Sequence, residues 1–299
     1  MKAVATVLPP TTAAPLAVPR VADFLDLLRP RVTLLVLVTV AAGAFLAAPG
    51  AVEPGLLLQA LAGTALVAAG ASCLNQYLER HTDALMRRTE NRPLPAGRLQ
   101  PALVVGLGVL LTAGGLVCLA LRAPVAAAVA GFTFASYVFV YTPLKRKTPL
   151  NTLVGAVPGA LPPVIGWAAV RDGIHLEAVA LFLIIFLWQV PHFMAIAWIY
   201  REQYARAGLK MLPVLDRDGR RTGRQMVRYC LLLVPASLLP AALGMVGPFY
   251  AVGAAALGVG FTAAALGFRR GPSVARARRV LRASLVYLPA LMSLLLLDV

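Results

Sequence analysis

The stretch NQYLERHTD, residues 75–83, closes a long apolar run and places three oxygen-bearing side chains four residues apart. Steps of four residues advance only about 40° around an α-helix, so Asn75, Glu79 and Asp83 share one stripe about 12 Å long. Carboxylate and amide oxygens are ligands that Mg²⁺ accepts, and Mg²⁺ commonly shares such ligands with substrate phosphates. The stripe therefore predicts a magnesium site at the polar end of a membrane helix.

Cationic and amide side chains follow the stripe directly, in the order Arg87, Arg88, Asn91 and Arg92. Arginine forks bind phosphate oxygens in a bidentate manner, so this loop is suited to a diphosphate. Because the stripe ends a hydrophobic helix, the rest of that substrate would lie in the bilayer, which indicates a polyprenyl diphosphate. The alternative is a cytoplasmic loop that is merely basic and is kept rigid by its prolines.

The composition of the 299-residue chain is that of a polytopic membrane protein. Hydrophobic residues make up 60% of it, charged residues only 13%, and the mean hydropathy is +0.79, whereas a soluble domain carries about twice that charged fraction. Nine apolar stretches approach or exceed the length needed to cross the bilayer. They cover residues 32–48, 55–78, 100–121, 124–142, 150–170, 175–200, 229–247, 249–268 and 283–298.

The distribution of positive charge predicts the orientation of these nine helices. With the N-terminus in the cytoplasm, 26 of the 28 Lys and Arg residues fall in cytoplasmic segments, and only Arg122 and Arg171 fall outside. This predicts a multi-pass protein of the cell membrane whose long loops are cytoplasmic. It also accounts for the net charge of +16 through topology and anionic lipid, so we expect no nucleic-acid partner.

Residues 1–22 are rich in proline, alanine and threonine, and we expect them to form a disordered cytoplasmic tail. Residues 23–299 are expected to form a single transmembrane domain. Cys73, Cys118 and Cys230 lie within predicted spans without metal-ligand spacing, which is typical of small buried residues.

The sequence YTPLKRK, residues 141–147, connects the fourth and fifth predicted helices. In one interpretation Lys145 and Arg146 bind the departing diphosphate while Tyr141 lines the reaction chamber. In the other, this is an aromatic residue at the membrane interface followed by a positive cytoplasmic loop.

The sixth predicted helix carries WQVPHF, residues 188–193, in an otherwise apolar segment. An ionisable side chain inside the membrane is a candidate functional residue, so Trp188, Gln189 and His192 are candidates for binding a second substrate. The alternative is a histidine that pairs with a nearby carbonyl. Beyond this helix, Glu202 is the one acidic residue near the membrane that could contribute to a second metal site.

Five motifs occur in an order that resembles the protohaem IX farnesyltransferases, the haem O synthases of the UbiA superfamily of intramembrane prenyltransferases. The motifs are Asn75-x-x-x-Glu79-x-x-x-Asp83, Arg88-Thr89-x-Asn91-Arg92-Pro93-Leu94, Tyr141-Thr142-Pro143-x-Lys145-Arg146, Trp188-Gln189-x-Pro191-His192-Phe193 and Met211-Leu212-Pro213-Val214. The match runs from about residue 24 to the end of the chain.

The resemblance implies a nine-helix bundle around a central cavity, with Mg²⁺ as cofactor. It implies farnesyl diphosphate and haem B as substrates and haem O as product. A haem A synthase is a candidate partner, although the sequence itself does not show that association. Ring-prenylating relatives carry a second Asp-x-x-x-Asp on the sixth helix, whereas this chain has His192, Tyr200 and Glu202 there. That departure leaves open how a second Mg²⁺ is held.

Two other functions remain open at this stage. A ring prenyltransferase of quinone biosynthesis is opposed by the missing second acidic pair and by the presence of Gln189 and His192. A secondary transporter is opposed by the position of the acidic stripe, because transporter sites lie near the middle of the bilayer on broken helices.

Overall fold

The computed structural model describes residues 20–48 and 50–299, and its regular elements are helices throughout that part of the chain. Most of the predicted tail over residues 1–22 lies outside the described residues, and the first helix begins at Val21. The elements in chain order are α1 (Val21–Leu28), α2 (Pro30–Ala47), α3 (Pro54–Asp83), α4 (Pro101–Ala120), α5 (Pro124–Ala135), the π-helix η1 (Ser136–Tyr141), α6 (Thr142–Leu144), α7 (Asn151–Ala160), α8 (Pro162–Arg171), α9 (Leu176–Ile199), α10 (Arg201–Arg206), α11 (Leu212–Leu215), α12 (Arg220–Ala242), α13 (Pro248–Arg270) and α14 (Val274–Leu297).

The prediction of nine membrane helices is confirmed for the described residues, which contain nine helical segments long and apolar enough to cross a bilayer. Seven of these spans are single helices. The span Pro124–Leu144 passes through the π-helix η1, and the span Asn151–Arg171 is divided between α7 and α8. Pro162 and Pro163 begin α8, and because they lack N–H groups they cannot continue the hydrogen-bond ladder of α7.

Three helices extend farther than hydropathy predicts. Helix α3 continues through the acidic stripe to Asp83, α12 begins at Arg220 instead of residue 229, and α14 begins at Val274 instead of residue 283. The added turns are polar or rich in arginine, and arginine is a good helix former. A hydropathy boundary therefore marks where the apolar segment ends, while the helix continues past it.

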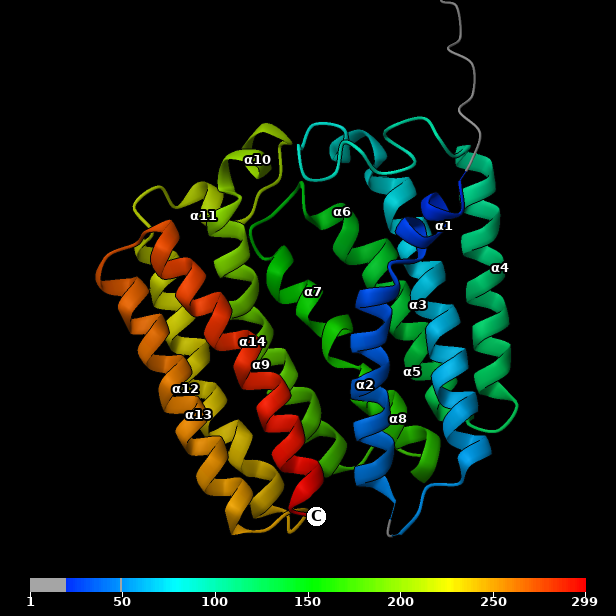
Figure 1. Ribbon diagram of the computed structural model, residues 1–299, viewed down its shortest axis with the longest axis vertical. Helices are drawn as coiled ribbons and strands as arrows, with labels where there is room; N and C mark the ends of the chain where they lie inside the picture. The colour runs from blue at the N-terminus through cyan, green and yellow to red at the C-terminus, as the bar shows by residue number, and fades with distance from the viewer. Residues whose placement is uncertain (1–19, 49) are drawn as a thin grey trace, which may run out of the picture.

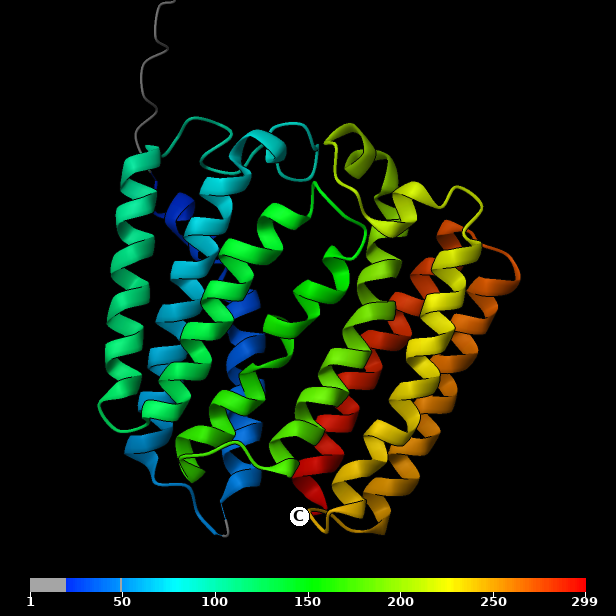
Figure 2. The same cartoon turned by 180° about the vertical axis from the view of Figure 1, so that it is seen from behind.

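The spans form two groups that meet at α9. Helices α2 to α8 lie on one side, and α9 packs with α12 and α14 on the other while also contacting α7 and α8 (Figure 1). The loop after α3, the loop after α6, and helices α10 and α11 all lie at one end of the bundle, as both views show (Figures 1 and 2). This end also carries the arginine-rich starts of α12 and α14.

Glycines allow helices of the first group to approach at backbone distance. A Cβ atom added at Gly166 of α8 would lie 1.8 Å from the carbonyl oxygen of Val40, and one added at Gly43 of α2 would lie 2.0 Å from that of Pro163. In lipid there is no hydrophobic driving force between helices, so van der Waals packing and polar contacts must stabilise the bundle. Small residues let the helix backbones approach closely enough for both.

We expect Gly166→Ala to destabilise the protein because the new methyl group would meet backbone and would force α2 and α8 apart. Overpacking of this kind costs about 1–3 kcal/mol. The matched control is Gly114→Ala on α4, where an added Cβ meets nothing within 4 Å. Thermal unfolding in detergent measures both variants, and equal melting temperatures would contradict the packing interpretation.

Candidate active site

Asn75 lies on α3 with its amide oriented by a threonine. Its Nδ2 donates to the hydroxyl of Thr142 over 3.0 Å, and that hydroxyl donates to the backbone oxygen of Tyr137 over 2.9 Å. The hydroxyl has one hydrogen, so it must accept from the amide nitrogen. The Oδ1 atom of Asn75 is buried and has no hydrogen-bond partner among the described residues. It is therefore an available oxygen ligand.

Glu79, one turn along α3, pairs with a lysine from the loop after α6. The Nζ of Lys145 lies 2.7 Å from Oε1 of Glu79 and 4.5 Å from the centre of the Tyr141 ring. Burial of the ammonium group opposes its charge, but Tyr141 and Glu79 beside it raise the pKa of Lys145 above its ordinary value. Lys145 therefore stays protonated at neutral pH.

Asp83, the last residue of α3, pairs with an arginine from the loop that follows. Its carboxylate is buried and lies 2.6 Å from Nη1 of Arg92. The charge of Arg29 acts on both members of this pair. Arg29 occupies the bend between α1 and α2 with a φ of 50°. Sequence reasoning assigned no role to Arg29, because only the fold brings that bend to the end of α3.

The loop of residues 84–100 is fastened on both sides of the stripe. On one side, Nε of Arg98 contacts the buried carboxylate of Asp23 in α1 over 2.6 Å. On the other, Nη2 of Arg88 donates to the hydroxyl of Tyr204 over 3.2 Å, and the backbone N–H of Arg88 donates to Gln203. Thus α1 and α10, which lie far apart in the sequence, hold one loop over the end of α3.

The remaining predicted phosphate ligands lie at the surface. Arg87, Asn91 and Arg146 have exposed side chains at the same end of the bundle as the stripe. Glu202 is also exposed, on α10. Within the described ranges, no group of three or more His, Cys, Asp and Glu side chains has the arrangement of a metal site. The structure therefore does not gather a second acidic cluster around Glu202.

Trp188 and His192 stack on one face of α9, with ring centres 4.7 Å apart. Both contact Ser284 of α14: the Trp188 indole donates to its backbone oxygen over 2.8 Å, and Nδ1 of His192 lies 2.7 Å from its hydroxyl. Sequence reasoning did not single out Ser284. The available signal was a hydroxyl residue in an otherwise largely apolar membrane helix, which is common and therefore weak.

Gln189 is directed toward α7. It is buried, and its Nε2 donates to the backbone oxygens of Ala156 and Ile185 over 3.3 and 3.2 Å. A Cβ at Gly159 would lie 2.1 Å from Oε1 of Gln189, so the glycine leaves space for this amide. The described hydrogen bonds of Gln189 thus join α9 to α7 through Ala156 and stay within α9 at Ile185.

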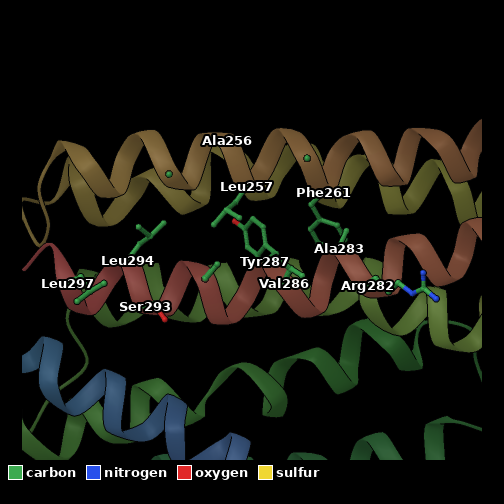
Figure 3. Close-up of a pocket in the computed structure, with 13 residues that line it drawn as sticks. Ala256, Leu257, Phe261, Arg282, Ala283, Val286, Tyr287, Ser293, Leu294 and Leu297 are labelled. Carbon is green, nitrogen blue, oxygen red and sulfur yellow. The ribbon is translucent and has the colours of Figure 1, made fainter.

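A separate hollow of about 860 Å³ lies between α13 and α14 (Figure 3). Its lining is almost wholly apolar, with Leu257, Tyr287 and Leu294 among the contributing side chains and Arg282 at one end. Val286 and Leu297 on its rim are 63% and 79% exposed, as expected for side chains that face lipid. The residues of the acidic stripe do not line it.

The fold and the site together are those of an intramembrane prenyltransferase, and the chain belongs to the UbiA prenyltransferase family, whose model matches residues 36–289. It is 46% identical over 286 residues to the protoheme IX farnesyltransferase of Solibacter usitatus, covering 92% of this chain and 98% of that protein. It is 43% identical over 278 residues to the protoheme IX farnesyltransferase of Salinibacter ruber, with coverage of 92% and 98%.

Solved structures with low sequence identity share the fold. One, described as giving insights into the biosynthesis of digeranylgeranylglyceryl phosphate synthase in membranes, superposes with a TM-score of 0.80 at 17% identity and covers 93% of this chain and 97% of its own. A UbiA homolog from Archaeoglobus fulgidus, bound to GPP and Mg²⁺, has a TM-score of 0.64 at 17% identity, with coverage of 91% and 99%.

We expect Arg92→Met to destabilise the protein by about 3 kcal/mol, because it leaves the Asp83 carboxylate buried with only Arg29 to offset its charge. Asp83→Asn in the same chain should recover most of this loss.

The matched control is Arg122→Met, which removes an ion pair with Glu53 whose two side chains are 47% and 56% exposed. An exposed pair contributes less than about 1 kcal/mol. Unfolding in detergent by a chemical denaturant measures the stability of all three variants. Equal losses in the free energy of unfolding for Arg92→Met and Arg122→Met would show that Arg92 does not stabilise the buried Asp83 carboxylate.

Proposed function

We propose that the protein transfers the farnesyl group of farnesyl diphosphate to a vinyl group of haem B and so forms haem O. The observation that carries this proposal is the stripe on α3. There the buried, unpaired amide oxygen of Asn75 precedes two carboxylates, and each carboxylate pairs with the flexible side chain of a lysine or an arginine. The relatives named protoheme IX farnesyltransferase support the choice of both substrates.

The residues present fit a magnesium site. Oδ1 of Asn75 is buried and unpaired in the described structure, and the carboxylates of Glu79 and Asp83 follow it at one-turn intervals. Together they would hold Mg²⁺ through hard oxygen ligands. Bound there, Mg²⁺ would neutralise charge on the diphosphate leaving group. The homolog from Archaeoglobus fulgidus, bound to GPP and Mg²⁺, supports this assignment.

The two ion pairs keep the cations ready for the diphosphate. Lys145 neutralises Glu79, and Arg92 neutralises Asp83. When the carboxylates engage a metal-bound diphosphate, these cations can turn to the phosphate oxygens without leaving any charge unpaired. Arg88, Arg87 and Arg146, with the Asn91 amide, would supply the outer contacts from the surrounding loops.

In the proposed reaction the bond between farnesyl C1 and the diphosphate oxygen breaks, and the electron pair leaves with the diphosphate. The vinyl group of haem B attacks the resulting allylic cation through its terminal carbon, forming the new carbon–carbon bond. Water then adds to the cation beside the porphyrin and releases one proton. The Tyr141 ring lies at 36° to that of Tyr137 and close to Lys145, and there it would provide an aromatic wall that keeps water from the allylic cation.

The acceptor would lie against Trp188 and His192 of α9, which offer a flat aromatic surface and an imidazole in an apolar span. Gln189 would act from behind this surface by fixing α9 to α7. Glu202 stays a candidate for a second metal. We propose further that the loops over the stripe are cytoplasmic, in the cell membrane, and that haem O passes to a haem A synthase.

The direct test is to supply the purified protein in lipid nanodiscs with farnesyl diphosphate, haem B and Mg²⁺. Haem O and diphosphate should form in equal amounts, measured by chromatography with mass detection and by a diphosphate assay. Diphosphate release without haem O, or prenylation only of an aromatic acid supplied in place of haem, would overturn the assignment of the acceptor. No release of diphosphate would overturn the assignment as an enzyme of this type.

We expect Thr142→Val to lower the rate of haem O formation by about 10- to 100-fold, the usual effect of losing a group that orients a metal ligand. Valine keeps the volume but no longer fixes Nδ2 of Asn75, so Oδ1 loses its orientation. Thr142→Ser keeps the hydroxyl and should retain most of the activity. The difference in rate between these two variants should become smaller as the Mg²⁺ concentration is raised. Equal rates for the two variants at low Mg²⁺ would show that Thr142 does not orient the metal ligand.

A further inference from the structure

Ser284 joins α14 to α9 beside the two aromatic residues proposed to meet the acceptor. It is completely buried, its backbone oxygen accepts from the Trp188 indole, and its hydroxyl lies 2.7 Å from Nδ1 of His192. The same hydroxyl lies 2.7 Å from the backbone oxygen of Leu281. Both short contacts must be explained by one hydroxyl group.

The hydrogen of that hydroxyl can serve only one of these contacts. A backbone oxygen can only accept, so the 2.7 Å contact with Leu281 requires Ser284 to be the donor. The hydroxyl oxygen then accepts from His192, which places a hydrogen on Nδ1. In the opposite assignment, Ser284 would donate to Nδ1 and two oxygens would approach to 2.7 Å without a hydrogen between them.

This arrangement fixes the chemistry of the other ring nitrogen. A doubly protonated imidazole is costly in an apolar span, so the ring is neutral and Nε2 carries a lone pair. Trp188 stacks on the ring at an interplanar angle of 25° and restrains its rotation. Because Ser284 is fully buried while His192 is only half-buried, the accessible part of the ring lies away from Nδ1. An Nε2 lone pair can ligate a metal ion, whereas it cannot donate a hydrogen bond to a carboxylate.

We propose that Ser284 is a positioning residue that holds His192 as the Nδ1-protonated tautomer, so that Nε2 ligates the iron of the haem substrate. This inference rests on the proposed function, because it presumes that haem is the acceptor. It chooses between the two roles open to His192, iron ligation and contact with a haem propionate, in favour of the iron. Hydrogen-bonded support of this kind orients most histidine ligands of metals.

The test uses the full chain in nanodiscs with haem B and compares Ser284→Ala, Ser284→Thr and His192→Ala. Ferrous haem on the unaltered protein should show an iron–histidine stretching band in its resonance Raman spectrum, and His192→Ala should lose it. Ser284→Ala should weaken haem binding about 10- to 100-fold, with a weaker or shifted band. Ser284→Thr should restore both. The bond from Trp188 goes to the backbone of residue 284, so it survives all substitutions at that position.

Metal-free protoporphyrin IX, which keeps both propionates, separates the two roles of His192. Its affinity should be the same for the unaltered protein and for His192→Ala, while the affinity for haem B falls. Equal losses for both porphyrins would assign His192 to a propionate and overturn the inference, as would a Ser284→Ala variant with an unchanged band and unchanged haem affinity. Farnesyl diphosphate binding by Ser284→Ala should match the unaltered protein, which shows that the variant is folded.

Failure of this inference differs from failure of the proposed function. If the protein makes haem O but shows no iron–histidine band, Ser284 and His192 do not act through iron and the function stands. If the protein neither binds haem nor forms haem O, both are overturned.

Discussion

Two buried or half-buried carboxylates at the end of α3 require cations, and this requirement organises the whole polar end of the bundle. Glu79 takes its cation from the loop after α6, and Asp83 takes its cation from the loop after α3. Removing one partner of such a pair is far more costly than the pair is stabilising, so each loop must close over α3 for the fold to be stable. The same closure assembles the cations that a diphosphate would need. Stability of the fold and readiness for the substrate thus depend on the same contacts.

Hydroxyl groups that donate to helix backbone oxygens orient the key ligands in both halves of the site. Thr142 gives its hydrogen to Tyr137 and therefore accepts from Asn75, which leaves Oδ1 unpaired. Ser284 gives its hydrogen to Leu281 and therefore accepts from His192. A hydroxyl used in this way becomes a fixed acceptor and selects one state of its neighbour, an amide orientation in one case and a tautomer in the other.

The nine spans and the acidic stripe could be predicted from sequence because both depend on local patterns. Hydropathy over about 20 residues reports a span, and four-residue spacing reports a helix face. The starts of α12 and α14 were misplaced, because hydropathy detects the apolar segment and not the helix that extends beyond it. The stripe and the basic loop after it indicated a polyprenyl diphosphate, whereas the farnesyl group and the haem acceptor came only from the resemblance of the motifs to a known family.

The partners of the site residues could not be predicted, because they come from other elements. The contacts of Ser284 with His192 and of Lys145 with Glu79 join residues far apart in the chain, and single serines and lysines in such positions are common. For Gln189, its place on the same helix as His192 was not enough to predict which groups its side chain contacts. It shares a helix with His192, but the fold turns its amide to the backbone of α7, a contact that depends on Gly159.

The central claim is that Lys145 leaves Glu79 for the diphosphate when substrate binds, and solid-state NMR can observe this directly. The chain has four lysines, Lys2, Lys145, Lys147 and Lys210, so ¹⁵N labelling of lysine gives few signals, and Lys145→Arg assigns the one of interest. In the ligand-free protein, Nζ of Lys145 should couple to a ¹³C-labelled glutamate carboxylate. With Mg²⁺ and a non-reactive farnesyl diphosphate analogue present, that coupling should weaken and a coupling to ³¹P should appear. Persistence of the glutamate coupling with no ³¹P coupling would contradict the account.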